Sequence, residues 1–220
     1  MVLRIFWNVG AGLVHRAINK NAIKPGMGVL YPAVWRGRPG MLDVDINMHL
    51  NNAAYLFNSD LARWHWVASS GMLFQALKQR QLFFVSSQTI RYRYPIPPLR
   101  PYEIRTEVSY MDDEWIYILH QFVCPTTGKL YAEALCRTTV KSGSARVAGR
   151  ELIRATSGID YEGPKEMPTV VDEFLKWDAS SRVTIESEEE REKRLAATAK
   201  STRRPQGLLG KITKTWNLPF

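Results

Sequence analysis

Residues 43–55, D-V-D-I-N-M-H-L-N-N-A-A-Y, bring two aspartates, a histidine and three asparagines together in one short stretch. A carboxylate can act as a general base or a nucleophile, and a neighbouring histidine or amide can orient a water molecule or a substrate carbonyl. A second interpretation is equally open at this point. The same side chains can cap a helix and accept hydrogen bonds from the amides of their own loop.

A long amphipathic helix is predicted to follow this motif. Apolar residues recur every three or four positions between Ala53 and Val67, and Asn51 or Asn52 is a suitable N-cap. The start of a helix offers unpaired N–H groups and the positive end of a dipole. A carbonyl placed near the amides of Asn52 and Ala53 would therefore be polarised. Gly71 is expected to end or interrupt this helix.

The rest of the chain predicts strands that follow helices. A second helical stretch is expected at 72–80, and the period then changes to the alternation of strands. The predicted strands cover 82–94, 102–110, 114–124 and 129–141. One long helix before antiparallel strands with short connections is an α+β arrangement.

The flanking segments carry weaker signals. Glycines and prolines make 25–41 an irregular connector, and 142–165 is expected to be a loop with a short helix. Two further helices are predicted at 169–178 and 187–200. The basic last twenty residues are expected to be disordered, or ordered only against a partner.

Composition bounds the class of protein. A chain of 220 residues with 45% hydrophobic and 23% charged residues is long enough for one sizeable domain plus tails. Its net charge of +9 favours anionic partners such as a phosphorylated molecule or an acidic membrane surface. Nucleic acid ranks far behind these, because the basic tail lacks any recognisable RNA-binding module.

The two cysteines, Cys124 and Cys136, lie in apolar strand-like runs. The sequence has no Cys-x-x-Cys pair and no Cys/His cluster at metal-binding spacing, so we expect no zinc or other metal site. Two core thiols in a reducing intracellular compartment are the favoured interpretation, although a disulfide between them is possible.

The N-terminus is basic and amphipathic. Residues 1–42 contain no Asp or Glu. Within the basic amphipathic segment 1–27, residues 2–18 predict a helix with a broad apolar face. Three roles stay open for it: lying in a membrane interface, acting as a mitochondrial import signal, or packing on its own domain or a partner. No apolar run is long enough to predict a transmembrane span.

The motif at 43–55 resembles the D-x-D-x-N-x-H-x-N-N-x-x-Y signature of plant acyl-ACP thioesterases and is similar to the 4-hydroxybenzoyl-CoA type of hotdog thioesterase. Further segments resemble the relatives of thioesterase superfamily member six: 60–63, 91–93, 101–106, 111–117 and, more weakly, 177–181. The resemblance covers roughly 28–180. It implies a hotdog fold, in which an antiparallel sheet wraps a long central helix. It also implies pairing into a dimer and an acyl-CoA or acyl-ACP substrate.

The resemblance also implies roles for single residues. Asp45 would be the general base or nucleophile, and Asn47 and His49 would orient the water or acyl group. The expected substrate-binding residues are Asn51, Asn52, Ala53 and Tyr55, whereas Asp43 is expected to be structural. Coenzyme A would be part of the substrate, with no separate cofactor.

One departure from the plant enzymes weakens the catalytic interpretation. Those enzymes carry a further acidic residue after the helix, and the corresponding stretch here, 80–88, has none. Asp60 is the only acid on the predicted helix. It lies about 12 Å along the axis from Asn52 at 1.5 Å per residue, so we expect a structural role for it, with Arg63 as its candidate partner.

The sequence therefore indicates two candidate functions. The first is an acyl-CoA or acyl-ACP thioesterase that uses Asp45. The second is an inactive hotdog protein that serves as a structural subunit or acyl-binding adaptor, and the acid-free N-terminus and basic tail favour it. The predicted organisation is a basic segment at 1–27, a hotdog domain at 28–145, a packed extension at 146–186, and a charged helix with a basic tail at 187–220. The expected location is a mitochondrion or the endoplasmic reticulum membrane.

Overall fold

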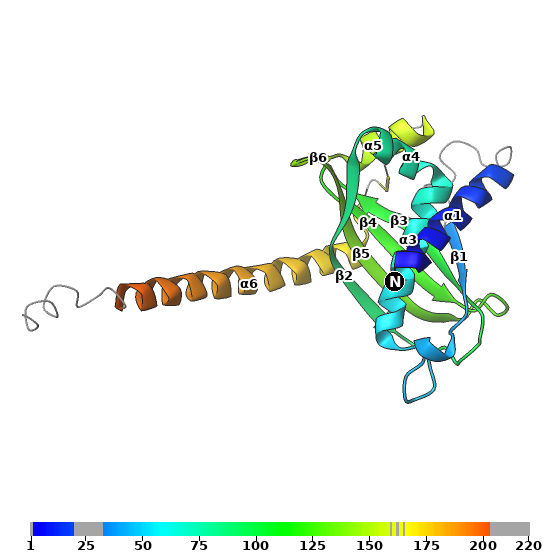
Figure 1. Ribbon diagram of the computed structural model, residues 1–220, viewed down its shortest axis with the longest axis horizontal. Helices are drawn as coiled ribbons and strands as arrows, with labels where there is room; N and C mark the ends of the chain where they lie inside the picture. Colours follow the sequence, from blue (N-terminus) through cyan, green and yellow to red (C-terminus); the bar gives the residue numbers. More distant parts are fainter. Residues whose placement is uncertain (1, 20–32, 159, 162, 165, 203–220) are drawn as a thin grey trace, which may run out of the picture. The chain divides into compact units, whose positions relative to one another are not determined.

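The computed structural model describes residues 2–19, 33–158, 160–161, 163–164 and 166–202. The chain divides into two units, 1–174 and 175–220. In the first unit an antiparallel sheet curls around one long helix, α3 (Asn52–Ser70), as Figure 1 shows. This confirms the predicted α+β arrangement.

The sheet has six strands in the order β1-β3-β4-β5-β2, and β6 pairs with the end of β5. The strands are β1 (Ala33–Gly37), β2 (Gln81–Tyr92), β3 (Tyr102–Met111), β4 (Ile116–Val123), β5 (Leu130–Ser142) and β6 (Ala145–Val147). The four long strands, β2 to β5, match the predicted ones to within two residues at every end.

Strand β1 was not predicted, because it lies in the segment interpreted as an irregular connector. Its five residues are flanked by proline and glycine and carry little local signal of their own. Pairing with β3 holds it in place, from Ala33 opposite Thr106 to Gly37 opposite Tyr102. A strand this short forms because of its partner and not because of its own propensity.

Helix α3 begins and ends where the sequence indicates. Asn51 is the N-cap: its backbone is extended, and its side-chain oxygen accepts a hydrogen bond from the Ala53 N–H at 2.8 Å. Gly71 ends the helix in the left-handed conformation, with φ of 91°. A short helix, α4 (Met72–Lys78), follows directly.

The core lies between α3 and the concave face of the sheet. Near the start of α3, Tyr55 and Ala62 join a buried cluster with Tyr102, Ile104 and Phe122. Toward its end, a second buried cluster also takes in residues of helix α5 (Gly149–Ser157). This cluster includes Trp66, Val67, Met72, Ile116, Ile118, Cys136, Leu152 and Ile153. Both cysteines are free and buried, as predicted.

The two helices predicted at 169–178 and 187–200 are one continuous helix, α6 (Thr169–Thr202). The reason is that no glycine or proline lies between them, and Arg182 and Asp178 form an i,i+4 ion pair of 2.9 Å across the predicted gap. The first two turns of α6 belong to the first unit, where Val171 and Phe174 are buried.

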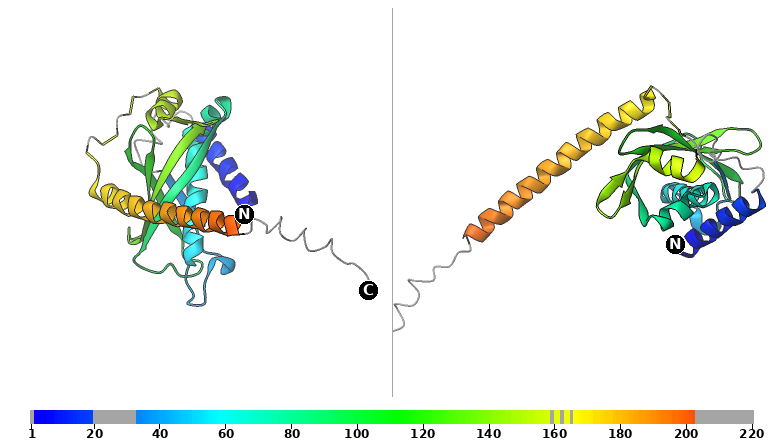
Figure 2. Two further views of the ribbon diagram at one scale, coloured as in Figure 1. Left: turned by 90° about the vertical axis from the view of Figure 1, so that its left-hand side faces the viewer. Right: turned by 90° about the horizontal axis from the view of Figure 1, so that it is seen from above.

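The N-terminal helix α1 (Val2–Ile18) packs against α3, and Figures 1 and 2 show the two side by side. Gly12 permits this close approach. A Cβ atom added there would lie 2.7 Å from the carbonyl oxygen of His65 and 2.8 Å from the Cβ of Ala68. Of the three roles left open for this helix, the structure shows packing on its own domain.

Polar contacts along α1 complete the attachment. The Trp35 indole donates a hydrogen bond to the Asn8 side chain, and Arg16 donates to the carbonyl of Ser69 at 3.3 Å. Arg4 forms an ion pair of 3.2 Å with Asp43. No helix in the described part of the chain is long and apolar enough to cross a membrane.

Gly12→Ala should weaken the attachment of α1, because the added methyl group meets backbone and side-chain atoms of α3. We expect the free energy of unfolding to fall by about 1–3 kcal/mol relative to Gly10→Ala. Gly10 is a matched control, since a Cβ there meets nothing within 4 Å and the gain in helix propensity is the same. Urea unfolding and hydrogen exchange of residues 2–18 measure both. Equal stability of the two variants would contradict this packing.

His65 should make the stability of this interface depend on pH. Burial, and then the nearby His15 ring 5.8 Å away, lower the pKa of His65 below its usual value. The folded state therefore resists protonation, whereas the unfolded state binds a proton near pH 6.5. Stability is full above about pH 6.5 and is lost as the pH falls below it. His65→Gln should reduce this slope between neutral and mildly acidic pH in urea titrations, and an unchanged slope would refute the assignment.

Candidate functional site

The motif folds into a short hairpin that leads directly into α3. A bridge pairs Val44 with Leu50, and the Asp45 N–H donates to the carbonyl of His49 at 2.9 Å. The Asn51 N–H donates to the carbonyl of Asp43 at 2.8 Å. The hairpin thus places Asp45 and His49 opposite each other, a few residues before the helix begins.

Asp43 serves the structure of this hairpin, as predicted. Its carboxylate accepts hydrogen bonds from Arg4 at 3.2 Å and from the Gly40 N–H at 3.1 Å. Partial burial acts to raise the pKa of Asp43, but the hydrogen bonds from Arg4 and Gly40 outweigh it and hold the pKa below its usual value. Asp43 therefore stays ionised and ties the hairpin to α1.

The two carboxylate oxygens of Asp45 differ in their contacts. Its Oδ1 accepts hydrogen bonds from the backbone N–H groups of Asn47 at 2.9 Å and His49 at 3.4 Å, and the His49 Nδ1 lies 3.6 Å away. These bonds close a tight turn in which Met48 takes a positive φ of 58°. Among the described residues, nothing donates a hydrogen bond to Oδ2. One oxygen thus shapes the loop, and the other stays open on a side chain that is 28% exposed.

The start of α3 offers one free donor where two were expected. The N–H of Ala53 is already bound to the Asn51 side chain, and the N–H groups of Ala54 and Tyr55 reach the Asn51 carbonyl. The N–H of Asn52 has no partner in the described part of the chain. Any oxyanion at this helix start would therefore be held by Asn52.

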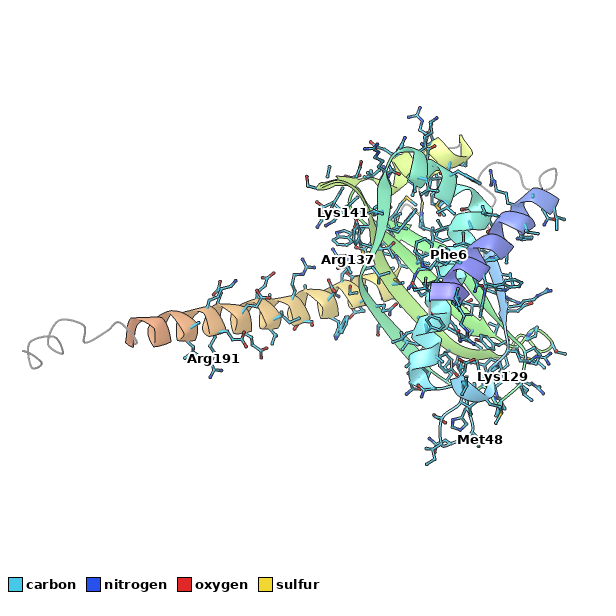
Figure 3. The ribbon with its side chains drawn as sticks, viewed as in Figure 1. Phe6, Met48, Lys129, Arg137, Lys141 and Arg191 are labelled. Carbon is cyan, nitrogen blue, oxygen red and sulfur yellow. The ribbon has the colours of Figure 1, made fainter. Side chains whose placement is uncertain are left out.

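The remaining predicted residues divide between surface and core. Asn47 is exposed at the hairpin turn, and Met48 marks the tip of the hairpin in Figure 3. Tyr55 is only 2% exposed, and its ring packs against those of Tyr92 and Phe122. Burial raises the pKa of Tyr55 to about 12, so its hydroxyl stays protonated.

A second polar cluster lies deeper in the fold. Its Asp60–Arg63 pair confirms the structural role expected for Asp60, whereas the sequence did not indicate that His120 and Thr106 would join it. Arg63 donates to the Asp60 carboxylate at 2.9 Å and to His120 Nε2 at 3.2 Å, while His120 Nδ1 lies 2.9 Å from the Thr106 hydroxyl. Because a guanidinium can only donate, Nε2 accepts, and Nδ1 carries the proton toward Thr106. Complete burial, and then the Arg63 charge, hold the pKa of His120 well below its usual value and keep the ring neutral.

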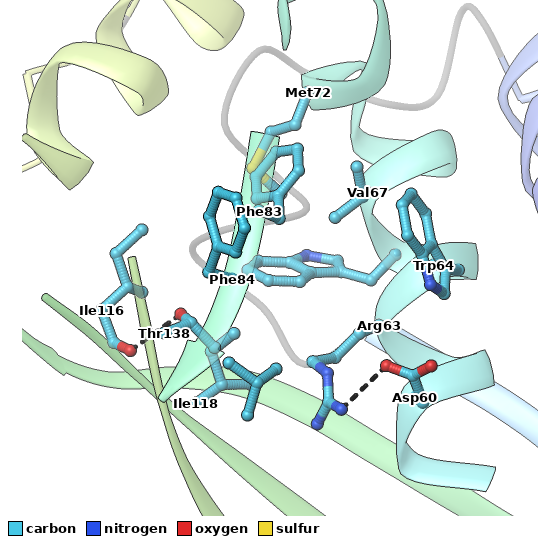
Figure 4. A pocket seen from close by; sticks show the side chains of 12 residues that line it. Asp60, Arg63, Trp64, Val67, Met72, Phe83, Phe84, Ile116, Ile118 and Thr138 are labelled. Carbon is cyan, nitrogen blue, oxygen red and sulfur yellow. Dashed lines mark hydrogen bonds and ion pairs between the residues drawn. The ribbon is translucent and has the colours of Figure 1, made fainter. Parts of the chain in front are cut away.

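An apolar cavity of about 80 Å³ opens beside this cluster, between the second half of α3 and the strands β2, β4 and β5 (Figure 4). Asp60 and Arg63 form its polar part. Its apolar lining includes Trp66, Val67, Met72, Phe83, Phe84, Ile116 and Ile118. No residue of the 43–55 hairpin and helix start lines it. The alternation of Ile116, Ile118, His120 and Phe122 on β4 is the sequence signal that could have placed His120 inside.

Within the described residues, no three His, Cys, Asp or Glu side chains are arranged to hold a metal ion. The hairpin and the helix start bring together a carboxylate, an imidazole and one backbone amide. This set suits general-base or nucleophilic attack on an activated carbonyl.

Residues 39–177 match the model of the thioesterase-like superfamily. Among curated relatives, Protein THEM6 of Drosophila melanogaster is 35% identical over 99 residues, which is 44% of this chain and 51% of the relative. Protein THEM6 of Danio rerio is 33% identical over 54% of this chain and 59% of the relative. The chain thus spans half to three fifths of the length of these two relatives.

A third relative is matched over more of its length. Protein THEM6 of Xenopus laevis is 30% identical over 66% of this chain and 68% of the relative. Solved structures share the fold at low identity. YbaW, a probable thioesterase of Escherichia coli, is 20% identical with a TM-score of 0.53 over 56% of this chain and 98% of its own. A hypothetical protein of Staphylococcus aureus, solved with CoA, is 14% identical with a TM-score of 0.51 over 61% and 87%.

The family model covers the hairpin, the central helix and strands β2 to β6, and the matches confirm the predicted hotdog fold. The chain belongs to the thioesterase-like superfamily and, within it, to the family of Protein THEM6.

Proposed function

We propose that the protein hydrolyses acyl-CoA thioesters, with Asp45 as general base or nucleophile. The observation that supports this most directly is the open Oδ2 of Asp45. The Asp45 side chain is held by its other oxygen, Oδ1, beside His49 in the hairpin that leads to the start of α3. The superfamily supplies the reaction class, and the neighbour solved with CoA makes CoA the favoured carrier over ACP. Coenzyme A enters as part of the substrate.

The proposed reaction follows one of two alternative routes, in which Asp45 is either a general base or a nucleophile. As a base, Asp45 takes a proton from water while the water oxygen adds to the thioester carbonyl, and the CoA thiolate then leaves with that proton. As a nucleophile, Asp45 attacks the carbonyl carbon and expels the CoA thiolate, which forms an acyl anhydride. In a second step water hydrolyses the anhydride to the free acid and restores the Asp45 carboxylate. In both routes the Asn52 N–H stabilises the developing oxyanion, while His49 and Asn47 orient the water or acyl group.

We further propose that the unit pairs with a second hotdog chain, either a copy of itself or another member. Strand β2 lies at the edge of the sheet and exposes apolar side chains, which are Leu82, Phe84 and Val85. An exposed apolar edge strand is a template for pairing with another strand. The cavity opens beside this edge, so a partner would cover it.

A non-catalytic role is the second candidate, and a specific observation favours it. Asp45 already spends one oxygen on its own turn, and the apolar cavity is lined further along α3 and not by the hairpin. A hotdog protein with these features could hold an acyl chain, or serve as a subunit or adaptor of a mitochondrial or membrane assembly, without hydrolysis. Residence at either place stays a prediction.

Asp45→Asn tests the enzyme proposal without removing the turn, because the Asn side-chain oxygen can still accept the two loop hydrogen bonds. We expect kcat on a panel of acyl-CoAs to fall by about 10²–10⁴-fold, the usual contribution of a general base. Thermal unfolding should be nearly unchanged. If the wild type turns over no chain length, the adaptor role stands instead; if the variant keeps full activity, Asp45 is not the catalytic group.

Leu82→Glu tests pairing through β2. Leu82 is 63% exposed and lies opposite Lys141 on β5, so the new carboxylate is tolerated within one chain. Facing a second chain, it would be desolvated. Sedimentation velocity should show a dimer for the wild type and a folded monomer for the variant. A wild-type monomer at high concentration, or an unchanged dimer of the variant, would count against this edge.

A further inference from the structure

The apolar residues of α1 divide between its two faces. On the face toward α3, Asn8 and Gly12 are buried, Ile5, Val9 and Leu13 are partly buried, and Arg16 reaches the end of α3. The opposite face is apolar and exposed. It consists of Val2, Leu3, Phe6, Trp7, Val14 and Ile18, each more than half exposed, with Leu3 at 84% and Trp7 at 78%. We call these six residues the outer face of α1.

Such a face is costly in water. At 100° per residue, Leu3, Phe6, Trp7 and Val14 fall within one third of the helix circumference, and no charged residue lies among them. A single exposed leucine is ordinary, whereas a contiguous patch with a tryptophan and a phenylalanine marks an interaction site. Within the described part of the first unit, the exposed fractions show that nothing covers it.

The surrounding charge identifies the partner. Residues 1–42 contain no Asp or Glu, so the whole N-terminal region repels no anion. Arg4 borders the outer face, and its side chain stays 53% exposed although it pairs with Asp43. Apolar and aromatic side chains beside a basic residue, in a region without acids, are features of a helix that lies in the headgroup region of an acidic bilayer. We propose that α1 docks the protein on an anionic lipid bilayer through this outer face.

The same helix is tied to the proposed catalytic hairpin. Arg4 binds Asp43, two residues before Asp45, and its guanidinium lies 5.7 Å from the ring centre of Phe57 in α3. Docking through α1 therefore holds the hairpin near the bilayer surface. This step rests on the proposed function, and it assigns long-chain acyl-CoA as the substrate class, because such chains partition into membranes. The docking itself requires no hydrolysis.

The test is co-sedimentation of the full chain with phosphatidylcholine vesicles that contain or lack phosphatidylserine. The wild type should bind the anionic vesicles more tightly, and added salt should weaken that binding. The partition coefficient of the double variant Phe6→Ser/Trp7→Ser should be lower than that of the wild type by roughly tenfold or more, since the variant removes two large apolar side chains from the interface. Phe74→Ser on α4 is the matched control, because Phe74 is also exposed, at 58%, and should leave binding unchanged.

Several outcomes would overturn the proposal. One is a wild type that binds neither vesicle. Another is a double variant that binds as well as the wild type, which would assign binding to the basic C-terminal residues. A third is a wild type that self-associates without vesicles through the same two residues, which would make the outer face a contact between copies. Asp45→Asn should bind vesicles like the wild type, so failure of hydrolysis and failure of docking are separate results.

Discussion

Enclosing α3 within the sheet is the constraint on which the rest of the structure depends, because it removes from water every polar group on the inner side of that helix. Asn58 meets the Tyr102 hydroxyl at 2.7 Å, and Arg63 meets Asp60 and His120. A buried polar group without a partner costs on the order of 1–3 kcal/mol. These pairs therefore help to fix how α3 sits against β3 and β4, and apolar packing alone would leave that register less determined.

The same constraint sets what the two ends of α3 can do. Toward its second half, the helix and sheet leave an apolar cavity whose polar part, Asp60 and Arg63, is already internally paired. At its start, the Asn51 cap consumes one of the two amides that an oxyanion could use. Chemistry at this site consequently depends on the two polar groups that make no hydrogen bond within the described residues, which are the Asp45 Oδ2 and the Asn52 N–H.

The sequence was informative where the signal is local. Asn51, Gly71 and the change from helical to alternating periodicity located α3 and the four long strands, and the spacing of Asp45, Asn47 and His49 placed them in one loop. It failed where the cause is tertiary. Strand β1 exists through its pairing with β3. The neutral state of His120 follows first from its burial in the core and then from the charge of Arg63, which is 57 residues away along the chain. The sequence identified Asp45 as a candidate. That one of its oxygens closes the turn while the other stays open depends on the folded geometry of the hairpin.

The N-terminal helix shows why periodicity alone could not decide its role. An apolar face on a basic helix normally predicts which side is buried. Here Asn8 and Gly12 are the most deeply buried positions, because a close backbone contact and a hydrogen bond to Trp35 attach that side of the helix. The outer face is then left exposed, while Arg4 joins the helix to Asp43 in the hairpin. A change in how α1 is held would thus reach Asp45 through Asp43 and one intervening residue, Val44. This short path gives the attachment of α1 a direct physical route to the candidate site, whichever of the two functions the hairpin performs.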